Sequence, residues 1–347
     1  MLSQRMDILT FFLNLKNRRI SMNIVSIDGG GYLGVASLAF IEEIERFYHT
    51  SFHQTFTLFC GTSTGAIIAL GLASGKTGKE LMQIYTKFGS LVFNNRLFWM
   101  RKFRLIRGFF LAQYSNTALR KLLKDFFGDI TLGDIKAQGK RVIITAFNLS
   151  NGKPRVFKTD HSADLNRDDR YYLRDIALAS SAAPIYLPIV TLQNPHTGVE
   201  ERFCDGGVFA NHPALLGYAE AVSHLAQDPQ SLKILSIATP RAELGQNFVK
   251  LSRWQQTVLS RGVISWSDSI ASIAIDATSM IAHETLRRVF AWQPAMQSRY
   301  VRITLPQPQT VALDIANESA TRALRNIGFE KACEAEIRNK LSGFFNE

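Results

Sequence analysis

The stretch NIVSIDGGGYLGVASLAFIEEIE, residues 23–45, runs from a short apolar segment through three glycines into helix-forming sequence. NIVSI predicts a buried strand, and the residues after the glycines predict a helix with one apolar face. That face carries Leu33, Phe40, Ile44 and Phe47. Backbone amides without side chains in front of them can hold a dinucleotide pyrophosphate, or the oxyanion that forms during acyl transfer.

The composition predicts a folded chain with one large domain and lobes. Of its 347 residues, 46% are hydrophobic, which is enough to bury a sizeable core. The three cysteines lie far apart and form no C-x-x-C pair, so we expect neither a disulfide framework nor a zinc site. No run approaches the ~18 apolar residues of a membrane span, and no signal-peptide cleavage pattern is present. We therefore expect a cytoplasmic protein that is neither secreted nor membrane-spanning.

Positive charge is concentrated in two segments. The net charge is +11, yet residues 81–124 alone hold nine basic residues, nine aromatic residues and no acidic one. Residues 1–22 hold four basic residues and one acidic residue, and the remainder is almost neutral. The 81–124 segment fits two interpretations: a lid or membrane-facing element, or a cap helix packed on the core with solvated cations. No nucleic-acid reading motif is present, so we expect no specific nucleic-acid recognition.

Strand and helix patterns alternate along the chain, which predicts an α/β sandwich around a mostly parallel sheet. Further strands are predicted at 56–60, 141–149, 199–204, 232–239 and 299–305, and helices at about 172–180 and 212–226. Residues 247–295 predict one or two helices, and the tail from about Ala316 predicts an amphipathic helix. The predicted organisation is an N-terminal arm (1–22), a catalytic domain (23–312) and a C-terminal helical tail (313–347).

A candidate nucleophile lies in GTSTG, residues 61–65, which fits G-x-S-x-G. This pattern describes a strained strand-to-helix turn that lifts a serine hydroxyl clear of the sheet. Alone, it is equally compatible with an ordinary turn. Its context favours the nucleophile, because an apolar strand precedes Gly61 and a small-residue helix follows Gly65. We therefore interpret Ser63 as the nucleophile, with Gly61 and Gly65 supporting the turn.

A serine hydroxyl needs a base to accept its proton. The stretch FCDGGVFANHPA offers Asp205, which ends a predicted strand and precedes Gly206 and Gly207. An isolated Asp-Gly-Gly is most often a β-turn. Beside a candidate nucleophile, its carboxylate at the same type of sheet edge is better interpreted as a general base.

A histidine could instead complete a Ser–His–Asp triad. The order Ser, Asp, His leaves three histidines after the aspartate: His212, His224 and His283. His224 and His283 fall in helical sequence, where a packed or surface imidazole is usual. His212 is close to the aspartate motif and stays open as an alternative.

A dinucleotide site is disfavoured. Gly29, Gly31 and Gly34 satisfy G-x-G-x-x-G, but the second predicted strand ends TLFC, without the acidic residue that binds a ribose hydroxyl. Asp28 would also place a negative charge against the pyrophosphate. We therefore expect the glycines to serve acyl transfer and Asp28 to be a structural carboxylate.

Taken together, these motifs resemble those of the patatin-like phospholipases, serine lipid acyl hydrolases with a Ser–Asp dyad. DGGGYLG, GTSTG and DGGVFANHP occur in the order of that family, and ASSAAPIYLP, residues 179–188, is similar to a family stretch near the site. The resemblance covers Ile24 to Pro213 and implies a three-layer α/β/α fold. It implies Ser63 as nucleophile, Asp205 as general base, and an oxyanion hole formed by the amides of Gly29, Gly30 and Gly31.

One position departs from the family pattern. A basic residue often precedes the last glycine of the first motif, and here that position is Leu33. The departure puts in doubt a contact between that cation and lipid phosphate, but not a hole made of backbone amides.

By this resemblance the protein hydrolyses acyl esters of membrane glycerolipids at the inner face of the membrane, without a cofactor or metal. SIASIAIDATSMIAHETLRRVF and RYVRITL also resemble bacterial members that a cyclic oligonucleotide activates in antiviral defence. That likeness implies a nucleotide activator and homo-oligomerisation. The alternatives are a non-catalytic lipid- or nucleotide-binding protein on the same fold, and a triad esterase for small substrates that uses His212.

Overall fold

A central sheet organises the computed structural model, which describes residues 22–92, 114–161, 167–225, 228–241, 263–308 and 315–346. In the eight-stranded sheet each strand of the series β5-β6-β3-β2-β1-β7-β8 hydrogen-bonds with the next, and β4 also pairs with β3. Strands β3, β2, β1, β7 and β8 are mutually parallel, whereas β4 and β6 pair antiparallel with β3. The bounds are β1 Met22–Ile27, β2 Leu58–Thr62, β3 Arg141–Asn148, β4 Lys153–Lys158, β5 Val190–Gln193, β6 Glu200–Asp205, β7 Leu232–Ile237 and β8 Tyr300–Ile303.

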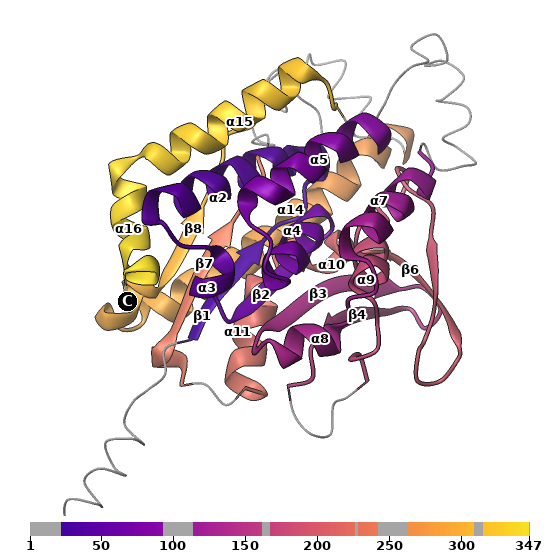
Figure 1. The fold of residues 1–347 in the computed structure, drawn as a ribbon, viewed down its shortest axis with the longest axis horizontal. Coiled ribbons are helices and arrows are strands. Elements are labelled where there is room, and N and C mark those ends of the chain that lie inside the picture. The colour runs from indigo at the N-terminus through magenta and orange to yellow at the C-terminus, as the bar shows by residue number, and fades with distance from the viewer. Residues whose placement is uncertain are drawn as a thin grey trace, which may run out of the picture.

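Helices cover both faces of this sheet, because successive side chains of a strand point to opposite faces. In β1, Val25 and Ile27 enter the core on one face, and Ile24 enters a second core on the other. The first face, in front in Figure 1, is covered by α2 (Gly34–Tyr48), α3 (Phe52–Thr55), α4 (Thr64–Ala73), α5 (Gly78–Val92), α7 (Thr117–Phe127), α8 (Leu132–Ala137), α9 (Leu173–Ser180), α15 (Glu318–Cys333) and α16 (Ala335–Phe345). The second face carries α10 (Gly207–Ala210), α11 (Ala214–Ser223) and α14 (Val263–Ala291). The predicted three-layer α/β/α sandwich is therefore confirmed.

Two strands have no counterpart in the sequence prediction. Strand β4, KPRVFK, is half charged, and β5, VTLQ, has four residues, so neither stands out as an apolar run. The prediction that Phe47 lies on the buried face of its helix is also wrong. The side chain of Phe47 is 41% exposed, and the Arg338 guanidinium lies over its ring at 3.8 Å from the centroid.

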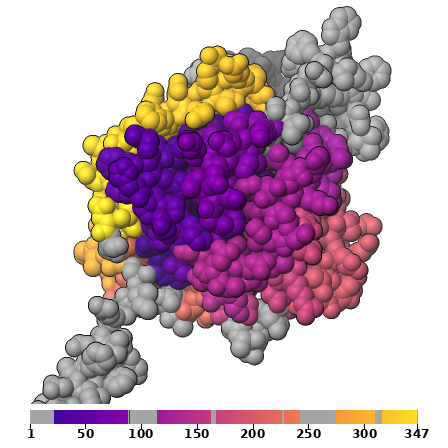
Figure 2. Space-filling model, in the orientation of Figure 1, coloured from indigo at the N-terminus to yellow at the C-terminus, as the bar shows by residue number. Residues whose placement is uncertain are grey.

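The C-terminal helices complete the front layer. Helix α15 lies along α2, so the first and last parts of the described chain are side by side, and Figure 2 shows both at the surface of that face. Leu324 and Leu341 are fully buried in the front core. The segment predicted to be one helical tail thus forms two helices that pack on the domain.

The two basic segments lie partly outside the described residues. Met22 is the first residue of β1, so the predicted arm would end at residue 21, and residues 1–21 are outside the description. Of the 81–124 segment, the described ends belong to α5 and α7, and Leu81, Leu119 and Leu123 are buried. The dense centre of that segment lies within 93–113, which is not described. None of the helices in the described ranges combines the length and the apolarity needed to cross a bilayer.

Candidate active site

Strands β2 and β6 meet end to end along one edge of β3. Strand β4 pairs with residues 143–148 of β3 and therefore fills its other edge. Strand β2 ends at Thr62, opposite Thr145, whereas β6 runs the opposite way and ends at Asp205, opposite Ala146. Because Thr145 and Ala146 are consecutive, the residue that follows Thr62 lies beside Asp205.

That residue is Ser63, which makes a sharp turn between β2 and α4. Its φ of 56° and ψ of −126° are strained for a non-glycine residue. The turn is tight enough that a Cβ on Gly61 would lie 2.5 Å from the Gly65 carbonyl oxygen. The Ser63 amide donates to Ser180 Oγ at 2.9 Å. This geometry matches a nucleophile elbow, in which strain holds the hydroxyl at the sheet edge.

Asp205 faces this serine from the end of β6. The carboxylate interacts with the Ser63 side chain and accepts a hydrogen bond from the Gly207 amide at 2.6 Å. The Asp205 amide donates to the Ala182 carbonyl at 2.9 Å. Burial raises the pKa of Asp205 to about 6, although the Ser63 side chain and the Gly207 amide both act to lower it. A carboxylate with a raised pKa is a stronger base than an exposed one, so this group suits proton removal from the serine.

The 179–188 stretch holds both groups in place. Through Ser180 Oγ it fixes the backbone of Ser63, and through the Ala182 carbonyl it fixes the backbone of Asp205. Ser180 is one contributor that the sequence analysis did not single out. Its only signal was its position inside ASSAAPIYLP.

The glycine loop lies on the other side of Ser63. A Cβ on Gly29 would lie 3.0 Å from Ser63 Cβ and 2.5 Å from Asn211 Oδ1. The Gly29 carbonyl accepts from Thr239 Oγ1 at 2.7 Å and from Asn211 Nδ2 at 3.4 Å. These donors fix the peptide plane between Gly29 and Gly30. The structure therefore brings the predicted oxyanion loop against the predicted nucleophile.

The three amides of this loop differ in their hydrogen bonds. The Gly29 amide donates to the Asn211 carbonyl and the Gly30 amide to Thr64 Oγ1, both at 3.3 Å. Gly31 has a φ of 57°, and its amide has no acceptor among the described residues. Gly31 is therefore the loop amide that is open to an oxyanion, while the other two are held by long hydrogen bonds.

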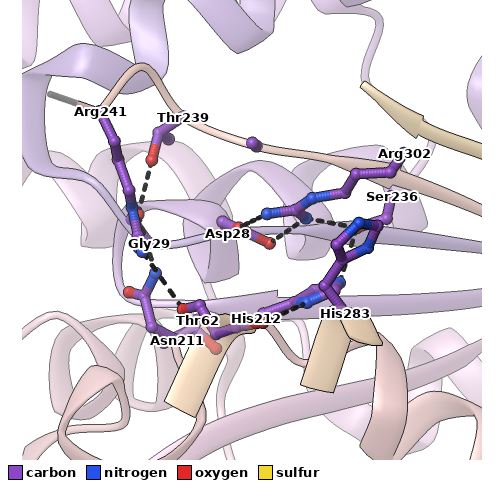
Figure 3. Close-up of polar contacts among 12 residues, drawn as sticks. Asp28, Gly29, Thr62, Asn211, His212, Ser236, Thr239, Arg241, His283 and Arg302 are labelled. Atoms are coloured by element: carbon purple, nitrogen blue, oxygen red, sulfur yellow. Dashed lines mark hydrogen bonds and ion pairs between the residues drawn. The ribbon is translucent and has the colours of Figure 1, made fainter. Parts of the chain in front are cut away.

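His212 lies in a polar network behind the loop (Figure 3). Burial and the Arg302 charge lower the pKa of His212 to about 4, so its imidazole is neutral at pH 7. Nδ1 donates to the Ser279 carbonyl at 3.3 Å, which leaves Nε2 as the acceptor for the Ser236 hydroxyl at 2.9 Å. Since both ring nitrogens are occupied away from the elbow, this geometry does not favour a triad. His283 is also occupied, by the Tyr300 hydroxyl at 2.8 Å.

Asp28 is structural in the way that the sequence suggested. It is fully buried, and its carboxylate is paired with Arg302. Across the described residues, no three His, Cys, Asp or Glu side chains are grouped to hold a metal ion.

Comparison with known proteins gives consistent matches over most of the chain. The model of a family described as "Patatin-like phospholipase" matches residues 25–217. A cGAMP-activated phospholipase of Vibrio cholerae is 32% identical, with 96% of this chain and 96% of that protein aligned. A cGAMP-activated phospholipase of Pseudomonas aeruginosa is 31% identical, with 90% and 88% aligned. A cUMP-AMP-activated phospholipase of Escherichia coli is 28% identical, with 62% and 63% aligned.

Proposed function

The chain belongs to the patatin-like phospholipase family, and from this membership we propose that it cleaves fatty acyl esters of membrane glycerolipids with Ser63 as nucleophile and Asp205 as general base. The observation that carries the assignment is the pairing of a strained serine with a buried carboxylate of raised pKa. The two side chains lie next to each other, so the proton can pass directly from the alcohol to the base.

The reaction follows from this geometry in two halves. Asp205 takes the Ser63 proton while the serine oxygen attacks the ester carbonyl, and the negative charge that develops on the carbonyl oxygen faces the glycine loop. When the tetrahedral intermediate collapses, the alcohol leaves with the proton from Asp205, and an acyl-enzyme remains. A water molecule then gives a proton to Asp205 and attacks the acyl-enzyme. When this second tetrahedral intermediate collapses, Asp205 returns the proton to Ser63 Oγ, and the fatty acid leaves.

Control by a cyclic dinucleotide is the second part of the proposal. Relatives aligned over nearly the whole chain are named as cGAMP-activated phospholipases. Ser63 and Asp205 are only 8% and 5% exposed, and we expect the activator to act by widening access to the hydroxyl. Contact with the inner membrane face and self-association on activation belong to the same proposal. Vesicle co-sedimentation and analytical ultracentrifugation, each with and without cyclic GMP–AMP, test them.

A fluorophosphonate probe separates an enzyme from a non-catalytic binding protein. We expect the wild-type protein to be labelled and Ser63→Ala not to be, with cyclic GMP–AMP present. Ser223→Ala removes an exposed serine on α11 and serves as the matched control, which should be labelled like the wild type. Failure of the wild-type protein to react, with or without the nucleotide, would favour the binding protein.

A fluorescent phospholipid assay tests whether cyclic GMP–AMP controls the activity. Hydrolysis that rises when cyclic GMP–AMP is added supports nucleotide control, and a rate that is independent of the nucleotide supports a constitutive lipase. Because a cUMP-AMP-activated relative also aligns, cyclic UMP–AMP is the comparison ligand.

A further inference from the structure

A buried carboxylate stands directly before the glycine loop. Asp28 is 0% exposed, and an ionised carboxylate in that position needs a partner because burial without one is strongly unfavourable. Arg302 supplies it, with Nη1 donating to Oδ1 at 3.0 Å and Nη2 to Oδ2 at 2.5 Å. Burial would raise the pKa of Asp28, but the Arg302 guanidinium brings it below its ordinary value, so the pair is ionised.

The sheet register explains how residues so far apart in sequence meet. Ser26 of β1 pairs with Ser236 of β7, which pairs with Arg302 of β8, so the three side chains share one face. Asp28 is two residues beyond Ser26 and continues along that face. The two serines are small, and the guanidinium crosses over Ser236 to reach the carboxylate (Figure 3).

The guanidinium itself has a fixed direction. Besides Asp28, Arg302 Nη1 donates to Ser236 Oγ at 2.6 Å, and the Ser236 hydroxyl donates to His212. His212 in turn donates to the Ser279 carbonyl of α14. The arginine is therefore held from two sides, by the carboxylate and by this chain of hydrogen bonds.

The fixed carboxylate constrains the loop that follows it. The Asp28 amide donates to the Ile237 carbonyl at 3.1 Å, so its backbone and its side chain are both held. The next peptide is fixed at the Gly29 carbonyl by Thr239. Consequently, the directions of the Gly30 and Gly31 amides depend on where Asp28 is anchored.

We propose that Arg302 is a positioning residue of the active site, which by anchoring Asp28 holds the glycine loop, and with it the open Gly31 amide, in the direction that an oxyanion requires. The inference rests on the proposed function. Arg302 lies outside residues 25–217, so the part of the chain that matches the family model does not supply this cation.

Four variants test the proposal: Arg302→Met, Arg302→Lys, Asp28→Asn and the double variant Asp28→Asn/Arg302→Met. For each, kcat and KM are measured on the monomeric ester p-nitrophenyl butyrate with cyclic GMP–AMP present, together with the melting temperature. Arg302→Met leaves a buried carboxylate unpaired, so we expect a lower melting temperature and a kcat reduced about 10- to 100-fold. Arg302→Lys keeps the charge but loses the bidentate geometry, and should fall between wild type and Arg302→Met.

The double variant separates positioning from stability. It removes the charge and its partner together, which is often neutral for folding, so its melting temperature should return close to that of the wild type. If Arg302 positions the loop, kcat stays at least about 10-fold low while KM changes by less than about 3-fold. If kcat recovers together with the melting temperature, the role is purely structural and the proposal is overturned.

Arg338→Met is the matched control. Arg338 pairs at 3.0 Å with the buried Glu43, which also pairs with Arg46 and lies on helix α2, further from the glycine loop. We expect a lower melting temperature with an unchanged kcat, and an equal loss of kcat would contradict a specific role for Arg302. A wild-type protein that neither hydrolyses the ester nor reacts with a fluorophosphonate overturns the proposed function and this inference with it.

Discussion

The Ser63 side chain lies next to the Asp205 carboxylate at the point where β2 and β6 meet on one edge of β3. The two residues come from strands that approach this point from opposite directions. Each is also fixed through its backbone to the 179–188 stretch, so the pair does not depend on mobile side chains alone. This relationship leads to predictions for activity and for stability.

The first prediction concerns the pH dependence of the reaction. Asp205 works as a base only when ionised, and burial raises its pKa to about 6. We therefore expect kcat/KM for a monomeric ester to rise about tenfold per pH unit below pH 6 and to level off above it. A profile measured from pH 4.5 to 8.5 checks this, and a flat profile down to pH 4.5 would exclude Asp205 as the base.

The second prediction concerns stability. Because the pKa of Asp205 is raised from 3.8 to about 6 in the folded state, its charge opposes folding increasingly as pH rises between these two values, and the penalty is constant above them. Asparagine carries no charge, so Asp205→Asn should raise the free energy of unfolding by on the order of 3 kcal/mol at pH 8 and by only about 1 kcal/mol at pH 4.5. Urea unfolding at both pH values measures the difference. A gain that is equal at the two values would contradict burial of the charge.

The third prediction concerns the glycine loop. A methyl group on Gly29 would collide with Asn211 and press on Ser63 Cβ, so Gly29→Ala should reduce kcat at least about 100-fold. Gly343 lies in α16, and a methyl group there would meet nothing within 4 Å, which makes Gly343→Ala the control. We expect the control to keep full activity and its free energy of unfolding to rise by up to about 1 kcal/mol. Equal activity in the two variants would show that the loop is not part of the site.

The fourth prediction distinguishes a dyad from a triad. His212 is neutral and hydrogen-bonded through both nitrogens, so His212→Gln should destabilise the fold by about 1–3 kcal/mol. In a dyad, kcat falls less than about 10-fold, whereas loss of a triad histidine costs about 10⁴-fold or more. Single-turnover kinetics on the folded variant decide between them.

Local motifs could be predicted from the sequence because their chemistry is local. The elbow at Ser63 needs small residues around one serine between a strand and a helix, and Asp205 directly follows an apolar strand end. The antiparallel direction of β6 could not be predicted, since it depends on which edge of β3 is free. The short strands β4 and β5 could not be predicted either, because neither is an apolar run.

The contacts behind the glycine loop could not be predicted from the sequence either. Asp28 and Arg302 are separated by 274 positions, and in RYVRITL the arginine alternates with apolar residues as any exposed strand residue would. Only the register of three strands shows that it faces inward. The differences among the glycine amides likewise depend on Asn211 and Thr64, which no pattern in the loop itself specifies.

The central claim is that Asp205 activates Ser63 for attack on a lipid ester. Fatty acid release from phosphatidylethanolamine–phosphatidylglycerol vesicles, with cyclic GMP–AMP present, tests it most directly in the wild type, Ser63→Ala and Asp205→Asn. We predict release by the wild type and a loss of at least about 1,000-fold in both variants, each with a wild-type-like circular dichroism spectrum. Release by Asp205→Asn at the wild-type rate would contradict the claim.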